Sequence, residues 1–428
     1  GGRASLSVIG NDIGWGEEHR LRHGRLMAFI KGRPELWVSA GEVGVATPRT
    51  WETGRRGGGL ETLRTLELFA GIGGLRAAFQ KAATLAKTSL KPLQEWIPLE
   101  ASPATQHVYE FNFELSYKPL LPRNISIMKP ADLDHADLWV MSPPCQPYTK
   151  LGKQLDTEDR RATPLGNLEQ MMPKLTHPPT AIFLENVSAF EHSESWERFS
   201  NTLVECGYEV RQFQLSPQQL GIPNRRPRFY SLARLRSGGR PALCDLETQF
   251  PGTDGVQTPR ARTLSEYLEE DLSAEALQAL VVPDDILRKL AERGQPWEVV
   301  HPSSTSSSTF TSGYGVDCRD CHRFGPVLQV GPETSSSADH IELPWRSNVD
   351  EGRFYRVIAP GEQVRFFSPL ELVRIAGFPS SFCFPKGTTA RQRYRLLGDS
   401  VNVDVVAHLL RYLVFEWTSL GLPHEAGT

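Results

Sequence analysis

A cysteine that follows two prolines is the residue in this chain best suited to nucleophilic chemistry. Cys145 lies in the sequence Met-Ser-Pro-Pro-Cys-Gln-Pro-Tyr, directly after the apolar run 138–140. Proline fixes its own φ and restricts the residue before it, so we expect this thiol on a rigid turn at the end of a strand. A thiolate presented in this way can attack an electrophilic carbon. An ordinary loop cysteine is the alternative at this point.

Three charged residues further along the chain could assist such a nucleophile. Glu185 abuts the apolar run 181–184, where partial burial would favour its protonated form and make it a proton donor. Arg226 and Arg228 stand two residues apart, so they face the same way in an extended segment. Two guanidinium groups placed like this suit a phosphate or an activated carbonyl. For Glu185 the alternative is a solvated turn acid.

A glycine-rich turn separates an apolar run from a helix-like segment near residue 70. The turn consists of Phe69, Ala70, Gly71, Ile72, Gly73 and Gly74. Glycines at such a junction let a ligand approach backbone N–H groups at the start of a helix. Glu100 closes the next apolar run and could accept hydrogen bonds from a ribose diol. The combination favours a nucleoside-containing cofactor, although the spacing is not the dinucleotide fingerprint, and a turn without ligand remains the alternative.

Six short apolar runs must position these residues, and each is followed by a turn and a helix-like segment. The runs cover residues 65–69, 96–99, 138–141, 181–184, 209–215 and 229–233. Apolar strands alternating with helices predict a mostly parallel sheet covered on both faces, which is a doubly wound α/β domain. Ligands of such domains bind at the carboxyl ends of the strands, where the cysteine, the glutamate and the glycine-rich turn are all expected.

The chain divides into four parts on its composition. Residues 1–60 are rich in glycine and arginine and have no clean period, so we expect a flexible extension. Residues 61–240 form the α/β domain. Residues 241–360 lose its rhythm and include the Ser/Thr tract (residues 303–312), nine of whose ten residues are Ser or Thr, so we expect a smaller domain with a mobile or ligand-contacting loop. Residues 361–428 return to the first domain, and 401–417 has the spacing of a long helix.

Composition and charge restrict the cellular setting. The 428 residues contain no apolar run near 18 residues and nothing that resembles a signal peptide, so no membrane association is expected. Six cysteines form no disulfide framework in a chain of this length, which indicates the cytoplasm or the nucleus. The net charge of −3 argues against general affinity for polyanions.

Any binding of nucleic acid must therefore come from local basic patches, of which there are two. Residues 225–240 contain six arginines and no acid, and residues 365–395 contain six basic residues and one acid. Aromatic residues lie among these charges, namely Tyr230, Phe366, Phe367, Phe378 and Tyr394. Aromatic and basic side chains together suit single-stranded nucleic acid, whereas a solvated charged surface is the alternative.

Four of these motifs, in this order, resemble those of the cytosine-5 methyltransferases. They are the glycine-rich turn from Phe69, Ser142-Pro-Pro-Cys-Gln-Pro, Leu184-Glu-Asn-Val and Arg226-x-Arg228. The sequence Arg391-Gln-Arg-Tyr-Arg-Leu-Leu-Gly-Asp-Ser-Val-Asn further resembles the tRNA methyltransferase subfamily, which acts on tRNA-Asp. The resemblance covers about residues 63–417. It implies a Rossmann-like α/β domain that uses S-adenosyl-L-methionine, with a target-recognition domain at 241–360.

The resemblance also implies a role for individual residues. Cys145 would add to C6 of a flipped cytosine, so that C5 can take a methyl group and S-adenosyl-L-homocysteine is left. Glu185 would hold the exocyclic amine and protonate N3, and Arg226 and Arg228 would orient the base. The implied cofactor site comprises the glycine-rich turn with Glu100, Ser142, Pro143, Ser400, Val401 and Asn402. Nucleic-acid contacts are implied at Thr309, Phe310, Thr311, Arg391, Arg393 and Arg395.

Two positions depart from the subfamily pattern. Its Cys-Phe-Thr reads Thr309-Phe310-Thr311 here, and its Gly-Asn-Ser reads Gly398-Asp399-Ser400, which adds a carboxylate near the cofactor. Cys318-x-x-Cys321-His322 matches the haem-attachment pattern and half of a zinc site, but further ligands at finger spacing are lacking. We expect exposed loop thiols there, and no metal.

Taken together, the sequence predicts a monomeric enzyme that methylates C5 of a cytosine in a tRNA anticodon loop, with tRNA-Asp as its partner. A DNA cytosine-5 methyltransferase is the first alternative, because the four catalytic motifs do not distinguish DNA from RNA. A cofactor-binding RNA-binding protein with little turnover is the second, should Asp399 or the altered recognition loop spoil catalysis.

Overall fold

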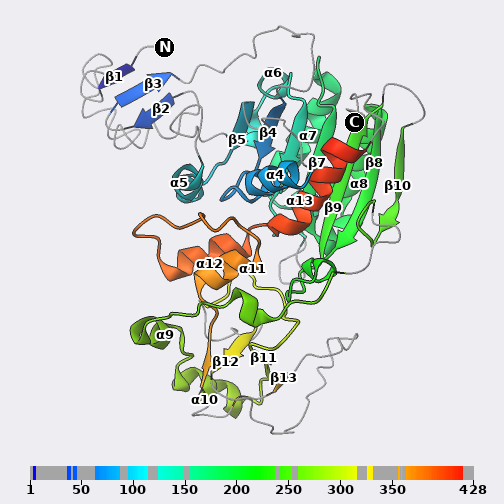
Figure 1. Cartoon of the computed structure of the whole chain (residues 1–428). Coiled ribbons are helices and arrows are strands. Elements are labelled where there is room, and N and C mark those ends of the chain that lie inside the picture. Colours follow the sequence, from blue (N-terminus) through cyan, green and yellow to red (C-terminus); the bar gives the residue numbers. More distant parts are fainter. Residues whose placement is uncertain are drawn as a thin grey trace, which may run out of the picture.

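The computed structural model describes most of the chain from residue 63 onward, together with three short strands before it (Figure 1). The described ranges are 63–86, 95–113, 124–148, 155–236, 241–252, 259–315, 325–330, 355–356, 358 and 363–417. The early strands β1 (Arg3–Ser5), β2 (Leu36–Ser39) and β3 (Glu42–Val45) pair antiparallel in the order β1-β3-β2. The expectation of a flexible extension at residues 1–60 missed them, because strands of three or four residues are too short to show a period.

A seven-stranded sheet carries the predicted α/β domain. Its strands are β4 (Arg64–Leu68), β5 (Glu95–Leu99), β6 (Leu138–Met141), β7 (Ala181–Val187), β8 (Tyr208–Leu215), β9 (Arg228–Leu235) and β10 (Ala242–Glu247). They lie in the order β10-β8-β9-β7-β6-β4-β5, and only the two pairings of β9 are antiparallel. The six predicted strands and the mostly parallel sheet are confirmed. The sheet continues past residue 240, where the sequence analysis ended this domain.

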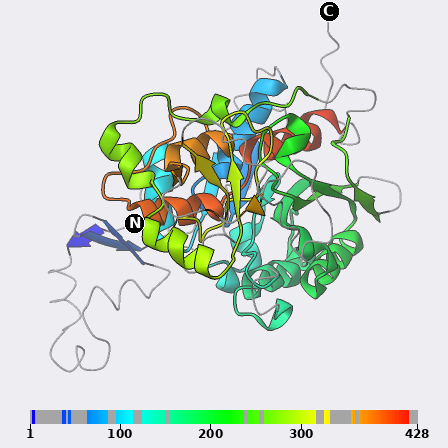
Figure 2. The ribbon, with the colours of Figure 1, turned by 90° about the horizontal axis from the view of Figure 1, so that it is seen from below.

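Both faces of the sheet are covered, because alternate residues of its central strands enter different cores. In β6, Leu138 and Val140 belong to one buried cluster, whereas Trp139 and Met141 belong to the other. Figure 2 shows α4 (Gly74–Leu85) and α13 (Val403–Arg411) on one side and α7 (Thr163–Met171) and α8 (Glu194–Glu205) on the other. The doubly wound arrangement is thereby confirmed.

Short helices fill several connections around this sheet. They are α5 (Pro103–Asn112), α6 (Pro130–Leu133) and the 3₁₀ segments Ile125–Ile127, Asp156–Glu158, Met172–Lys174, Ser188–His192 and Pro217–Leu220. The predicted C-terminal helix is present as α13, which continues into a π-helical turn, Tyr412–Glu416. In the part of the chain described, no helix is long and apolar enough to cross a membrane.

A smaller lobe lies beyond the carboxyl ends of the central strands (Figure 1). It contains the 3₁₀ segment Leu264–Tyr267, α9 (Ala274–Leu280) and α10 (Asp284–Glu292). Its strands β11 (Trp297–Val300), β12 (Val327–Gln329), β13 (Tyr355–Arg356) and β14 (Val364–Arg365) form a sheet in the order β13-β11-β12-β14. Helices α11 (Pro369–Ile375) and α12 (Ala390–Gly398) lie between this lobe and the large sheet.

Candidate active site

Three adjacent strands bring the predicted catalytic residues to one edge of the sheet. Cys145 follows β6, and Glu185 lies near the carboxyl end of β7. Because β9 runs antiparallel to β7, its first residue, Arg228, pairs with Val187 at this same edge. The sheet order therefore joins residues that are 40 or more positions apart in the sequence.

The Glu185 carboxylate is buried and held from two sides. Ser142 Oγ donates a hydrogen bond to Glu185 Oε2 at 2.6 Å. Arg228 Nε lies 3.6 Å from Glu185 Oε1, which forms an ion pair. Ser142 was predicted as a cofactor residue, but its hydroxyl is directed to Glu185. A hydroxyl and a guanidinium together fix the carboxylate in one orientation before any base is bound.

Asn186, to which the sequence analysis gave no role, attaches the loop that carries Cys145 to β7. Asn186 is buried, and its Nδ2 donates to Pro143 O at 3.3 Å. Its Oδ1 accepts from Val187 N at 2.8 Å. The motif Leu184-Glu-Asn-Val contained this signal, because a buried asparagine beside a strand end requires hydrogen-bond partners. Pro143, predicted as a cofactor residue, thus contributes its carbonyl to the support of the loop.

The Cys145 thiol is half-buried, and both positively and negatively charged side chains lie near it. Burial is the main cause that raises its pKa above the ordinary value of a cysteine. The guanidinium groups of Arg228 and Arg226 lower this pKa, whereas Glu185 and Asp399 raise it. In the absence of substrate the residue is therefore a thiol at neutral pH, and the nucleophile forms only when its proton is removed.

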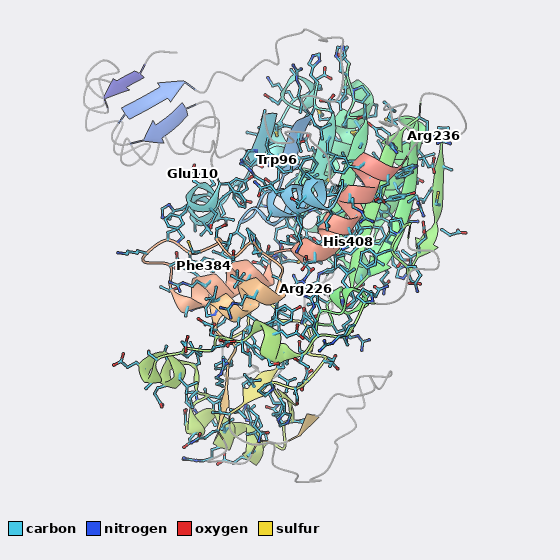
Figure 3. All side chains as sticks on the ribbon, in the orientation of Figure 1. Trp96, Glu110, Arg226, Arg236, Phe384 and His408 are labelled. Carbon is cyan, nitrogen blue, oxygen red and sulfur yellow. The ribbon has the colours of Figure 1, made fainter. Side chains whose placement is uncertain are left out.

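The Arg226 guanidinium is bound within the protein, so the expected role of Arg226 and Arg228 in orienting the base stays a prediction. This guanidinium donates to three backbone carbonyls, those of Phe310 at 3.0 Å, Gly398 at 2.9 Å and Ser400 at 2.5 Å. Arg226 precedes β9, which begins at Arg228. Burial lowers the pKa of Arg226 to about 10. Arg226, which Figure 3 labels at the junction of the sheet with α12, is a positioning residue that joins three segments.

The Ser/Thr tract is docked against the segment that precedes β9. Ser307 Oγ donates to Pro223 O at 2.7 Å, and Asn224 Nδ2 donates to Ser308 O at 2.8 Å. Thr309 Oγ1 donates to Arg225 O at 2.8 Å. These contacts explain why serine and threonine recur here, since their short hydroxyls satisfy the carbonyls of a neighbouring irregular segment. Of the two expectations for this loop, these contacts argue against mobility, and contact with a ligand stays a prediction.

The three predicted nucleic-acid contacts in this tract serve mainly to shape the loop. The Phe310 ring is buried and packs edge-on against Tyr314 and Phe367, each at 5.1 Å between centroids. It is therefore not available to stack on a base. The backbone of Thr311 passes so close to Gly398 that a Cβ there would lie 2.3 Å from Thr311 C. This segment reaches the active site through its carbonyls and through Ser312.

The glycine-rich turn has the backbone conformation that its composition requires. Gly71 and Gly73 have φ values of 56° and 90°, and Phe69 shares this left-handed region at 59°. Gly71 N donates to Glu100 Oε2 at 2.9 Å, and Ser102 N donates to Glu100 Oε1 at 2.7 Å. A Cβ on Gly71 would meet only Phe69 O, at 3.9 Å, so the turn is open on that side. Glu100 keeps lone pairs for a ribose, because each carboxylate oxygen accepts more than one hydrogen bond.

Ser400 and Val401, two of the predicted cofactor residues near the C-terminus, lie against the glycine-rich turn. A Cβ on Gly74 would lie 2.8 Å from Val401 Cγ2 and 3.0 Å from Ser400 Oγ, so the absence of a side chain permits this approach. Asn402 is directed into the fold instead. Its Oδ1 accepts from Val405 N at 3.1 Å at the start of α13, and its Nδ2 donates to Ile375 O at 3.1 Å. Both ends of the Asn402 amide are bound within the protein, so its side chain is engaged in the fold and its expected contact with the cofactor stays a prediction.

A small pocket of about 30 Å³ has Arg226 in its lining. Its lining includes Asn224, Phe310, Leu397 and Val401. Neither the glycine-rich turn nor Cys145 contributes to it. We assign it to the packing of the three segments that Arg226 joins.

The predicted basic residues on α12 divide into two kinds. Arg391 and Arg395 are exposed, and at a spacing of four they lie on one face of the helix. Arg395 Nε lies 3.9 Å from Asp399 Oδ2. Arg393 Nε donates to Thr388 O at 2.9 Å, and its guanidinium lies 5.6 Å from the Phe384 ring. The exposed pair is free to meet a polyanion, whereas Arg393 is partly engaged in the fold.

Comparison with known proteins agrees with this geometry. The family model described as C-5 cytosine-specific DNA methylase matches residues 63–414. A tRNA (cytosine(38)-C(5))-methyltransferase from Bos taurus is 30% identical over 411 residues, covering 83% of this chain and 100% of the relative. One from Schizosaccharomyces pombe is 32% identical over 356 residues, covering 82% and 97%. A DNA (cytosine-5)-methyltransferase from Dictyostelium discoideum is 27% identical, covering 83% and 95%.

Solved structures show the same similarity in three dimensions. The crystal structure of the S. pombe Dnmt2 methyltransferase matches with a TM-score of 0.63 at 30% identity, covering 83% of this chain and 99% of that chain. A mutant of Spodoptera frugiperda DNMT2 matches with a TM-score of 0.60 at 27% identity, covering 82% and 99%. With the family model spanning both the catalytic sheet and the smaller lobe, this chain belongs to the C-5 cytosine-specific DNA methylase family.

Proposed function

We propose that this protein transfers a methyl group from S-adenosyl-L-methionine to C5 of a cytosine in a tRNA anticodon loop, with tRNA-Asp as the expected substrate. The convergence of Cys145, Glu185 and Arg228 at one strand edge is the observation that carries the chemistry. Relatives named as tRNA methyltransferases, which this chain matches over most of their length, support the choice of tRNA.

Each of the three residues has a task that its contacts suit. Cys145 loses its proton, adds to C6 of the cytosine, and thereby makes C5 nucleophilic. Glu185, held by Ser142 and Arg228, gives a proton to N3 as the ring accepts electrons from sulfur. After C5 is methylated, water takes its proton, the electrons of that bond re-form the double bond and expel Cys145, and the N3 proton returns to Glu185. Arg228 stabilises negative charge throughout, because it stands beside both the carboxylate and the thiol.

The residues around the glycine-rich turn fit a nucleoside cofactor. Gly71 leaves open space at the end of β4, and Glu100 stands beside it with its carboxylate oriented by two backbone N–H groups. When bound there, S-adenosyl-L-methionine supplies an electrophilic methyl group. The protein's part is to hold the ribose through Glu100 and to keep Ser400 and Val401 against Gly74.

A methyl-transfer assay tests this function. The full chain is incubated with methyl-labelled cofactor and either a tRNA-Asp transcript or duplex DNA, and C145A is compared with C383A, which removes an exposed cysteine elsewhere. We expect label in tRNA with the parent and C383A, and none with C145A. Label in DNA but not in tRNA would instead establish the DNA methyltransferase, which the Dictyostelium relative represents.

A second measurement separates an enzyme from a binding protein. A tRNA that carries 5-fluorocytosine cannot lose its C5 substituent as a proton, so the adduct with Cys145 should persist in denaturing gels. Tight binding of tRNA with neither methyl transfer nor this adduct would support the RNA-binding alternative. We further propose that the enzyme acts as a monomer in the cytoplasm or nucleus, as its sequence leads us to expect.

A further inference from the structure

Two histidines and an aspartate meet at the edge of the sheet opposite the active site. Asp134 and His135 lie between α6 and the start of β6, and His177 lies in the loop before β7. Since β6 and β7 are parallel neighbours, their amino ends are adjacent, as their carboxyl ends are at Cys145 and Glu185. The cluster could not be found from spacing, because His177 is more than 40 residues from its partners.

The three side chains bring their potential ligand atoms close together. Asp134 Oδ2 lies 4.0 Å from His135 Nε2 and 4.0 Å from His177 Nδ1. All three ligand atoms lie within 4.8 Å of one another. The imidazole rings are stacked with centroids 4.0 Å apart. Both ring nitrogens thus lie beyond hydrogen-bonding distance of the same carboxylate oxygen, and a shared ion would require the stacked rings to rotate apart.

The backbone holds this arrangement in place. Asp134 is buried, and its Oδ1 accepts from His177 N at 2.6 Å and from His135 N at 3.2 Å. His135 N also donates to His177 O at 3.2 Å. His135 has a φ of 66°, a conformation rare for residues other than glycine. The two loops are therefore joined independently of the ring nitrogens, so those nitrogens are left for another partner.

We propose that Asp134, His135 and His177 bind a Zn²⁺ ion. Two imidazoles and one carboxylate form a ligand set that suits Zn²⁺, whereas Mg²⁺ and Ca²⁺ favour sites made of oxygen. Bonds of about 2.0 Å in tetrahedral geometry place ligand atoms about 3.3 Å apart, so the ring nitrogens need to move inward by about 1 Å and the stacked rings need to rotate out of their parallel arrangement. His177 is half-exposed, which leaves the fourth position open to water.

The ion would join the segments that precede two strands whose opposite ends carry the catalytic groups. It binds the folded chain and not the separated loops, so it should raise the temperature of unfolding. At free Zn²⁺ 100-fold above its dissociation constant we expect a rise of about 3 °C. The site lies away from Cys145, so it is structural and takes no part in methyl transfer.

Calorimetric titration with Zn²⁺ and thermal unfolding in Zn²⁺ or EDTA test the proposal. The parent for these measurements is the full chain with C318S and C321S, because those thiols with His322 lie outside the described residues and could compete for the ion. H135N removes an imidazole but keeps a residue that tolerates positive φ, and H177A removes the exposed ligand. H107A, an exposed histidine on α5, is the matched control.

We expect the parent and H107A to bind one equivalent of Zn²⁺, and H135N and H177A to bind at least tenfold more weakly and to lose the thermal shift. A parent that binds no Zn²⁺ would overturn the proposal. Equal binding by the parent and both variants would overturn it too, because the ion would then lie elsewhere. If the variants lower the unfolding temperature in EDTA while Zn²⁺ has no effect, the cluster is only a packing contact.

Discussion

Asp399 is the residue at which this active site differs electrostatically from its subfamily pattern. Its side chain is 39% exposed, and partial burial raises its pKa, while a hydrogen bond from Ser312 and the charge of Arg395 lower it. It is close enough to Cys145 to raise the pKa of that thiol. An asparagine in its place would exert no such charge.

We predict that D399N makes Cys145 more reactive near neutral pH. Below its pKa, the thiolate fraction of a cysteine increases as that pKa is lowered, so removal of a nearby negative charge should speed its alkylation. Mass spectrometry of the Cys145 peptide after timed treatment with iodoacetamide at pH 7 should show a rate at least about twofold higher than in the parent. E292Q, which removes an exposed charge on α10, should leave the rate unchanged. An unchanged rate in D399N would show that its charge is screened from the thiol.

Glu67 is a second titratable residue of interest, and it lies wholly buried in β4 below the glycine-rich turn. Its Oε2 accepts from Trp96 Nε1 at 2.8 Å and from the Tyr109 hydroxyl, and its Oε1 accepts from Arg76 N at 3.2 Å. Burial outweighs these contacts and raises its pKa from 4.5 to about 7. The folded protein therefore retains a proton at Glu67 that the unfolded chain releases.

We predict that E67Q alters how stability depends on pH. Between pH 4.5 and pH 7 the folded state binds the Glu67 proton and the unfolded state does not, so stability falls as pH rises through this interval. Glutamine does not titrate, and the loss of unfolding free energy from pH 4.5 to pH 8 should be about 3 kcal/mol smaller in E67Q. Urea unfolding at several pH values measures this. If E67Q and its exposed control E292Q give the same pH dependence as the parent, Glu67 does not titrate in this range.

At the scale of elements, α12 and the Ser/Thr tract are in close contact beside the active site. Arg226 holds the carbonyls of both segments, and Gly398 lets them meet. A Cβ on Gly398 would lie 2.2 Å from Ser312 N, so the backbone itself would have to move. Gly166 on α7 offers a contrast, because a Cβ there would meet nothing within 4 Å.

We predict opposite effects of alanine at these two helical glycines. G166A should be neutral or stabilising by about 0.5–1 kcal/mol, because alanine favours a helix. G398A should destabilise by about 1–3 kcal/mol and lower kcat, since it separates the tract from α12 and disturbs the carbonyls that Arg226 holds. Urea unfolding and methyl transfer measure the two effects. If G398A keeps wild-type stability and activity, the Ser/Thr tract moves away from residue 398 without a measurable loss of unfolding free energy.

At the scale of the whole molecule, the interface between the two lobes is where a polyanion would have to lie. Arg365 of β14 makes a bidentate ion pair with Glu371 of α11, at 2.7 Å and 2.8 Å, so the smaller lobe is tied to the helices beneath the large sheet. Helix α12 extends from this junction with Arg391 and Arg395 exposed. In a chain of net charge −3, such a local positive surface is the feature that would attract phosphates.

We predict that R391Q/R395Q weakens tRNA binding and its dependence on salt. Each lost phosphate contact lowers the slope of log affinity against log salt by about 0.7 to 0.9, so the double variant should lose roughly 1 to 2 units of slope. K174Q/R198Q also removes two positive charges, but near the other face of the sheet, and should retain the parent's slope. Fluorescence anisotropy with tRNA-Asp at 50–300 mM salt provides the comparison. Equal losses in both variants would indicate attraction by net charge alone.

The sequence by itself determined the main strands of the large sheet and the position of the candidate nucleophile at a strand end, because these depend on local chemistry. Apolar runs and their turns predicted the strands, and Pro-Pro before Cys145 predicted a thiol presented at a strand end. The left-handed backbone of Gly71 and Gly73 likewise follows from residue type. Glu185 could be placed beside Cys145 because carboxyl ends of neighbouring parallel strands meet at one edge.

Only the tertiary structure decided where the long polar side chains go. Arg226 turns to carbonyls 84 to 174 residues away, Ser142 bonds to Glu185 across 43, and Asn402 caps its own helix. The cluster around Asp134 likewise forms only when two strands pair. A flexible side chain takes whichever buried partner the fold brings near, because an unsatisfied buried polar group costs more than a change of rotamer. Spacing along the chain carries no information about that partner, whereas period and turn chemistry do specify the strand that supports it.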